Sequence, residues 1–140
     1  MSQKTQPSGA QLRDFRDHPR QGTIQMINLL KFYDRAQYQP GEVDDDDVTG
    51  REAYLHYGAA VGKIVASLGG RIVWSGQPEV VFIGDDGDLW DEVVVVEYPS
   101  REAFLQMIAM PVYQAAHIHR EAGLAYQQLI ECRPGGDAIA

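Results

Sequence analysis

The stretch "GTIQMINLLKFYDR", residues 22–35, decides the fold, because it has the composition of a β-strand but no face suited to water. Side chains along a strand alternate between two faces. Neither face is a solvent face, and a single asparagine lies in the more apolar one, so both should be covered. The first face carries Ile24, Met26, Asn28, Leu30 and Phe32, and the second carries Gln25, Ile27, Leu29 and Lys31.

The next segments predict a helix and then an extended chain. Thr49 and Glu52 fit a capping box at a helix start, and apolar residues then recur at helical spacing. The segment "RIVWSGQPEVVFIG", residues 71–84, is predicted to be extended, with a bulge or bend near Gly76 and Pro78. The proline favours an edge position in a sheet.

The second half repeats this order. The segment "DEVVVVEY", residues 91–98, predicts a strand, Ser100 can cap a helix that Pro111 divides, and "AYQQLIEC", residues 125–132, predicts a last strand. A short helix capped by Ser8 precedes the first strand. The order βαββαβ predicts a ferredoxin-like α+β fold with an antiparallel four-stranded sheet. Its central strands would be the first and third, which are the two most continuously apolar here.

This topology sets the expected organisation of the chain. Residues 1–22 would be an N-terminal extension with a short helix, loose over residues 1–7. Residues 23–133 would form the ferredoxin-like domain, and residues 134–140 a disordered tail. The two main helices of this fold lie on one side of the sheet, so the simplest cover for the other side is a second copy of the chain. We therefore expect a homodimer that encloses a chamber.

Composition excludes several classes of function. The chain has 140 residues, 44% hydrophobic, with a net charge of −8, so binding to nucleic acid or to an anionic membrane surface is not expected. No apolar run approaches the length of a membrane span or a signal-peptide core. A single cysteine, Cys132, excludes an intrachain disulfide and suggests the cytoplasm. The acidic run Asp44 to Asp47 lacks the spacing of a calcium loop, and no glycine-rich phosphate loop follows a strand, so we expect no metal and no cofactor.

Candidate catalytic residues lie on the helix that begins at Pro111. Tyr113 and His117 are four residues apart and face the same side, where they could form an acid–base pair. His119 points away from His117, which makes the two a poor metal-binding pair. Both histidines remain candidates, and a surface pair or a dimer contact is the structural alternative. An apolar stripe on the same helix is expected to pack on the sheet and comprises Val112, Ala115, Ile118, Ala122 and Ala125.

Candidate ligand-binding residues combine an apolar body with one polar group, as small-molecule pockets often do. Asn28 could orient a ligand carbonyl, or it could tie a strand to a helix. Lys31 could face an anionic ligand, although lysines at strand ends usually extend to solvent. The remaining candidates are Tyr57, Trp74, Tyr98 and Arg120.

Four segments together resemble one bacterial family. "MINLLKF", "SLGGRIVWSG", "LWDEVVVVEYPSREAFLQM" and "PVYQAAHIHREAGL", in this order, are similar to domain-of-unknown-function family 1330, in the dimeric α+β barrel superfamily. The resemblance covers roughly residues 12–133. It implies a ferredoxin-like protomer, a homodimer and a pocket between sheet and helices, and it points to His119 and Arg120. It implies no established reaction, because that superfamily includes cofactor-free monooxygenases, small isomerases, haem proteins and proteins of unknown role.

These observations lead to two hypotheses about function. The first is a cytoplasmic homodimer whose aromatic pocket binds a small, partly apolar organic molecule. If it is an enzyme, the chemistry would be cofactor-free proton transfer next to a carbonyl or oxygenation of a small aromatic, with His117 or His119 as base. The alternative is a non-catalytic binding or interaction module without an open pocket. Cavity volume distinguishes the two.

Overall fold

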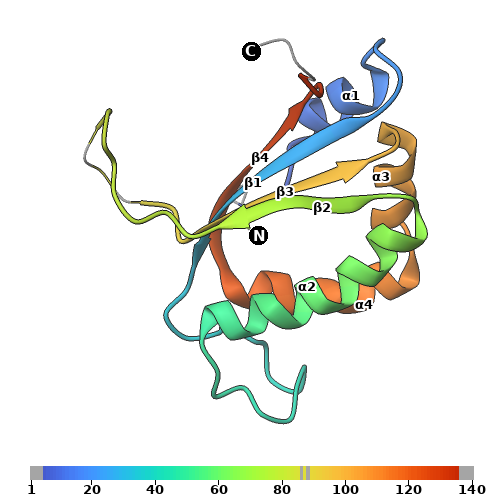
Figure 1. Ribbon diagram of the computed structural model, residues 1–140. Helices are drawn as coiled ribbons and strands as arrows, with labels where there is room; N and C mark the ends of the chain where they lie inside the picture. Colours follow the sequence, from blue (N-terminus) through green and yellow to red (C-terminus); the bar gives the residue numbers. More distant parts are fainter. Residues whose placement is uncertain (1–4, 86, 88, 136–140) are drawn as a thin grey trace.

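The computed structural model describes residues 5–85, 87 and 89–135, which form one antiparallel sheet and the helices that cover it (Figure 1). The sheet order is β2-β3-β1-β4, which places β1 and β3 in the centre as predicted and confirms the ferredoxin-like α+β fold. The elements are α1 (Gly9–Asp17), β1 (Ile24–Phe32), α2 (Gly50–Ser67), β2 (Arg71–Gly76), β3 (Glu92–Tyr98), α3 (Arg101–Ile108), α4 (Pro111–Gly123) and β4 (Leu124–Cys132).

The helix starts are those that the sequence predicts. Thr49 accepts a hydrogen bond from the Glu52 amide at 3.0 Å, and the Glu52 carboxylate accepts one from the Thr49 amide at 2.8 Å. This reciprocal capping box satisfies two amides that would otherwise lack partners at the start of α2. Ser8 forms the same reciprocal box with Gln11 at α1, whereas the Ser100 side chain at α3 only accepts from the Ala103 amide, at 3.0 Å. Pro111 occupies the first turn of α4, where it loses no helical hydrogen bond.

The two faces of the sheet have different surroundings. On β1, the face of Ile24, Met26 and Leu30 packs under the helices, and these side chains are almost fully buried. The opposite face is half-exposed along the central strands. The segment 89–91 meets one end of it, at Lys31 and Tyr126, and no helix of the described chain lies over its centre (Figure 1). We call it the uncovered face, and its apolar residues are Ile27, Leu29, Trp74, Val93, Val95 and Ile130.

Two glycines bring α4 and α2 into close contact. A Cβ atom on Gly123 would lie 2.4 Å from the carbonyl oxygen of Gly50, and one on Gly50 would lie 2.1 Å from the carbonyl oxygen of Tyr33. The Tyr33 amide also donates to the Gly123 carbonyl at 2.9 Å. Only glycine fits at this approach, which joins the C-terminal end of α4 to the start of α2 and the end of β1.

The orientation of α4 differs from the prediction. Of the apolar stripe expected to pack on the sheet, Ala122 is buried, but Val112 is 56% exposed and Ala115 is exposed, whereas Tyr113 and Ala116 are buried. The inward face is therefore the more polar one, which also carries His117 and Arg120. The physical reason is that α4 packs against α2 through small residues and leaves space beneath it, which these longer side chains occupy.

The connection between β2 and β3 agrees with the predicted break near Gly76 and Pro78, but no extended strand resumes after it. Strand β2 ends at Gly76, and residues 77–84 form no strand, since Pro78 cannot donate to a ladder. The register shift lies between Ile72 and Trp74 rather than near Gly76. Strand β2 does occupy an edge, as expected from the proline.

The N-terminal segment is partly ordered, contrary to the expected loose residues 1–7. Thr5 is only 4% exposed, and Gln6 donates to Glu121 at 2.9 Å. These contacts hold the start of the described chain against α4. Residues 1–4 and 136–140, which include most of the predicted disordered tail, lie outside the described residues.

Candidate functional site

A cavity of about 660 Å³ lies between the covered face of the sheet and the surrounding helices. We call it the central cavity. Strands β1, β3 and β4 form its floor, α3 and α4 its walls, and α1 with residues 5–7 closes one side. Its apolar lining includes Met26, Phe104, Met107, Ile108 and Leu129.

His117 is the titratable base in this lining. Its Nε2 lies 3.3 Å from the Gln6 side-chain nitrogen, 3.5 Å from Arg120 Nη1 and 3.7 Å from Glu121 Oε2. Burial lowers the pKa of His117 below its ordinary value, Arg120 lowers it further, and Glu121 partly offsets both effects. Two N–H donors face Nε2, so the neutral ring with its lone pair on Nε2 fits this environment best.

Arg120 places a positive charge beside His117. Its side chain is 11% exposed. Nη1 donates to Glu121 Oε2 at 2.8 Å, and Nη2 donates to the side-chain oxygen of Gln127 on β4. The guanidinium therefore bridges α4 and the sheet, and it remains close enough to the cavity to contact an oxygen atom of a ligand.

Three tyrosines contribute hydroxyl groups to the cavity wall. The hydroxyls of Tyr57 on α2 and Tyr113 on α4 lie 3.0 Å apart, and their rings meet edge to face. Tyr98 on β3 lies close to Met107, with its hydroxyl 4.0 Å from the sulfur. Burial raises the pKa of Tyr57 and of Tyr98 well above the ordinary value, so both remain neutral at physiological pH.

Asn28 is the only amide side chain that β1 contributes to the cavity. Its Nδ2 donates to the carbonyl oxygens of Met26 at 3.3 Å and Val94 at 3.2 Å. Both N–H groups are thereby directed at the sheet, which favours the role of tying neighbouring strands. No donor to Oδ1 is found in the described part of the chain, so this oxygen can accept a hydrogen bond from a ligand.

Six of the nine residues selected from the sequence line the central cavity together. They come from four different elements, and the topology rather than sequence proximity unites them. They are Asn28, Tyr57, Tyr98, Tyr113, His117 and Arg120.

The other three selected residues lie elsewhere. Lys31 and Trp74 are on the uncovered face, where Lys31 donates to the Leu89 carbonyl at 2.8 Å and Trp74 is 56% exposed. His119 lies outside the cavity, with its Nδ1 2.6 Å from the Tyr38 hydroxyl and its ring 5.5 Å from that of His56. The geometry therefore separates His117 from His119.

Several polar residues at the cavity were not selected from the sequence, and three of them contact His117 or Arg120. Gln127 shares a face of β4 with Leu129, an alternation that could have identified it. Glu121 follows His117 by one helical turn, which was also visible in the sequence. Gln6 offered no signal, because nothing local indicates that an N-terminal polar residue returns to α4.

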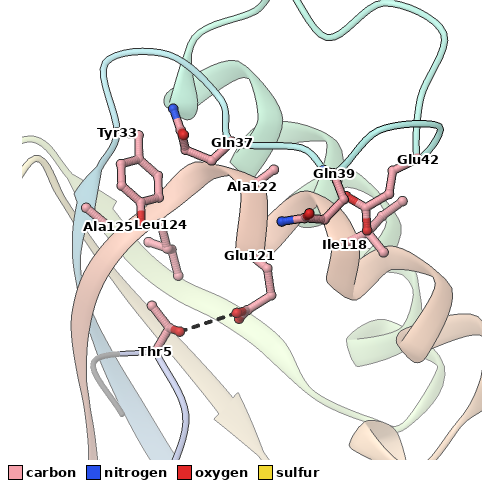
Figure 2. A pocket seen from close by; sticks show the side chains of 10 residues that line it. All are labelled: Thr5, Tyr33, Gln37, Gln39, Glu42, Ile118, Glu121, Ala122, Leu124 and Ala125. Carbon is pink, nitrogen blue, oxygen red and sulfur yellow. Dashed lines mark hydrogen bonds between the residues drawn. The ribbon is translucent and has the colours of Figure 1, made fainter. Parts of the chain in front are cut away.

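A second, smaller pocket of about 220 Å³ lies behind Glu121 (Figure 2). It is formed by the loop after β1, which contributes Tyr33, Gln37 and Glu42, and by the junction of α4 with β4. Figure 2 shows Thr5 reaching Glu121 from the N-terminal segment, at a distance of 3.4 Å. Glu121 thus faces this pocket while its carboxylate holds Gln6 and Arg120 on the cavity side.

Two searches of the described residues define what the site lacks. No group of three or more histidine, cysteine, aspartate or glutamate side chains lies close enough to hold a metal ion, within residues 5–85, 87 and 89–135. In the same residues, no helix has the length and hydropathy needed to cross a membrane.

Comparisons with known proteins identify the family. Two crystal structures of RPA0582, one of them methylated and one described as a protein of unknown function from Rhodopseudomonas palustris, are each 41% identical to this chain. They match 91% of it and 92% and 94% of their own chains, with TM-scores of 0.83 and 0.82. A dimeric protein of unknown function and ferredoxin-like fold from Bacteroides fragilis shares 13% identity over 80% of this chain and 96% of its own, with a TM-score of 0.44.

No curated protein matches the chain. The model of DUF1330, a domain of unknown function, matches residues 43–131. That match contains α2, β2, β3, α3, α4 and nearly all of β4. The chain therefore belongs to the DUF1330 family.

Proposed function

We propose that this protein is a homodimer that binds a small, partly apolar organic molecule in the central cavity. The observation that carries the proposal is the cavity itself, since about 660 Å³ lies in the range typical of small-molecule sites. Its lining is mixed, because aromatic and aliphatic side chains alternate with polar groups from residues 5–6, α4 and β4. A binding or interaction module without an open pocket would have this volume filled by side chains.

The polar groups indicate the chemistry of the ligand. Arg120 provides a positive charge, Tyr57 and Tyr113 provide hydroxyls, and Asn28 provides an accepting oxygen. A ligand with an apolar ring or chain and an oxygen function fits these groups. A carbonyl or carboxylate oxygen can accept from Arg120 or a tyrosine hydroxyl, and a donor such as a phenol hydroxyl is needed to bond Asn28 Oδ1. The apolar part of the ligand would contact Met26, Met107 and neighbouring side chains.

If the protein is an enzyme, His117 is the base. The lowered pKa keeps its imidazole neutral at physiological pH, as proton abstraction requires. A proton next to a carbonyl, or on a phenol, would pass to Nε2 in place of the Gln6 contact. The negative charge that develops on the ligand oxygen would then lie near Arg120. Both isomerisation and cofactor-free oxygenation by dioxygen would begin with this step.

The dimer part of the proposal is supported by the uncovered face. Leu29, Val93 and Val95 lie on central strands, on the face opposite the buried side chains of Ile24, Met26 and Leu30, and all three are partly exposed. An apolar face of this kind marks an interaction site. A second copy that packs sheet to sheet would cover it, and the remaining contacts would follow from two-fold symmetry.

Blocking the cavity tests ligand binding directly. Leu129 lines the cavity from β4 and is 41% exposed, so Leu129→Trp adds volume there without crowding the buried core. Leu55→Trp on α2, where the side chain is 61% exposed, is the matched control. The probe is anilinonaphthalene sulfonate, whose aromatic body and negative charge suit the lining. We expect at least about tenfold weaker dye binding, or about 1.4 kcal/mol, for Leu129→Trp alone.

Two results would count against the proposal. Equal dye affinity in the wild type and in Leu129→Trp would place the dye outside the cavity, and no binding to the wild type would indicate that the cavity does not accept such molecules. Once a substrate is found, His117→Gln should abolish turnover while His119→Gln retains it. The reverse pattern would reject His117 as the base.

A further inference from the structure

The start of the described chain forms part of the wall of the central cavity. Residues 5–7, which we call the strap, lie against α4 and belong to the cavity lining, as do Gln11, Leu12 and Phe15 of α1. The strap and α1 precede β1 and pair with no strand of the sheet. This wall is therefore an addition to the framework that the sheet and helices α2 to α4 provide.

The strap is held by a few polar contacts that converge on one carboxylate. The Thr5 hydroxyl donates to Glu121 Oε1 at 3.4 Å (Figure 2), and Gln6 Nε2 donates to Glu121 Oε2 at 2.9 Å. Gln6 Nε2 also lies 3.3 Å from His117 Nε2. In the described chain, residues 5–7 form no other hydrogen bond. Each such contact adds little net stability, because water replaces it when it breaks.

Helix α1 adds little to the attachment of the strap. None of its residues is fully buried. It is anchored near its C-terminal end by Phe15, whose ring meets the ring of Phe104 on α3 edge to face, with 5.3 Å between the centroids. Segments with few buried contacts open locally at a lower free energy than the core. The strap can therefore leave α4 while Phe15 stays on α3.

In the closed strap, Gln6 occupies the position that a ligand of His117 needs. A neutral imidazole offers a single acceptor lone pair. Arg120 Nη1 donates to Glu121 at 2.8 Å and lies 3.5 Å from His117 Nε2, so Gln6 is the closer donor to that nitrogen. A ligand that places an acidic proton at Nε2 must therefore displace the Gln6 amide.

We propose that the strap is a gate of the central cavity, in which Gln6 occupies the acceptor nitrogen of His117 until a ligand displaces it. This inference rests on the proposed function and adds the control of access to the same site. The apparent affinity for a ligand would be reduced by the fraction of molecules in which the strap is closed. Glu121 holds the closed state, because both strap side chains bond to its carboxylate.

The reactivity of His117 tests the gate without a ligand. Diethyl pyrocarbonate acylates the unprotonated nitrogen of a histidine ring, and peptide mass spectrometry with fragmentation gives the rate at each histidine. His18, which is exposed, is the reference within the same molecule. Gln6→Ala should raise the rate at His117 relative to His18 by about tenfold, since an open state of the wild type would be populated at roughly 10% or less.

Gln106→Ala is the matched control, because Gln106 is exposed on α3 and lies outside the cavity lining. It should leave the reactivity of His117 unchanged. Unchanged reactivity of His117 in Gln6→Ala would overturn the gate.

Dye binding separates failure of the gate from failure of the proposed function. Anilinonaphthalene sulfonate should bind Gln6→Ala about tenfold more tightly than the wild type, because the closed strap no longer competes with it. Gln106→Ala should bind the dye as the wild type does. Equal dye affinity in the wild type and in Gln6→Ala would overturn the gate and leave binding in the cavity intact. Absence of binding to both proteins would instead reject the proposed function.

Discussion

The two faces of the sheet are both largely apolar, but only one of them packs against helices of its own chain. Neighbouring residues of β1 show the contrast, because Leu30 is fully buried under the helices whereas Leu29 points to the uncovered face. The covered face packs against helices of its own chain around Ile24, Met26 and Tyr98. The uncovered face has no such cover in the described chain.

The contrast shows that an apolar strand face does not identify what covers it. On the covered side, the helices leave a cavity, and long polar side chains such as His117 and Arg120 line it. On the uncovered side, polar contacts lie at the ends, where Gln25 donates to Glu97 at 2.9 Å and Lys31 reaches the Leu89 carbonyl. The centre between them is apolar, which is the pattern of a protein–protein interface with a polar rim.

The largest expected effect concerns the two leucines. Leu30→Ala should lower the free energy of unfolding by about 2–5 kcal/mol, because it leaves a cavity in the core. Leu29→Ala should instead weaken the dimer by about tenfold, or roughly 1.4 kcal/mol, and change the stability of the isolated protomer little. Chemical denaturation over a range of protein concentrations measures both.

Concentration dependence provides the control within the same experiment. The loss in Leu30→Ala should be the same at every protein concentration, whereas the loss in Leu29→Ala should vanish where the wild type has already dissociated. Equal and concentration-independent losses would mean that both leucines belong to one core. The distinction between the faces would then be wrong.

A smaller expected effect concerns the pKa of His117 on the covered side. His117 should titrate below its ordinary pKa of 6.5, as followed by NMR of its ring protons. Arg120→Gln should raise this pKa, since the guanidinium lowers it, and Glu121→Gln should lower it further. His56→Gln should raise the pKa of His119 and leave His117 unchanged, because His56 lowers only the former.

The same lowered pKa predicts how stability depends on pH. Above pH 6.5 the ring is neutral in both the folded and the unfolded chain. As the pH falls below 6.5, the unfolded chain binds the proton more readily, so stability decreases until the folded-state pKa is passed. A His117 that titrates at or above 6.5 would contradict the buried environment described for it.

Local signals in the sequence predict most of the fold. Thr49 with Glu52 marks the start of α2, Pro111 divides α3 from α4, and the continuous apolar character of β1 and β3 identifies them as central. These features depend on near neighbours in the chain or on strand alternation. They can therefore be predicted from the sequence alone.

The candidate site was predictable only in part. Tyr113, His117 and Arg120 share a helix face, so their proximity follows from helical spacing. The direction of that face does not, because the close approach of Gly123 to Gly50 sets the rotation of α4, and tertiary contacts of this kind leave no local pattern. The return of Gln6 to His117 is equally non-local.

The oligomeric state of the intact protein tests the central claim most directly. Native mass spectrometry of the wild type should give twice the mass of the chain. Val95→Glu, which introduces a charge at the centre of the uncovered face, should give the mass of one chain, while Leu55→Glu on the outer surface of α2 should remain dimeric. A wild type with the mass of one chain, or a Val95→Glu variant that stays dimeric, would contradict the proposal that a second copy covers this face.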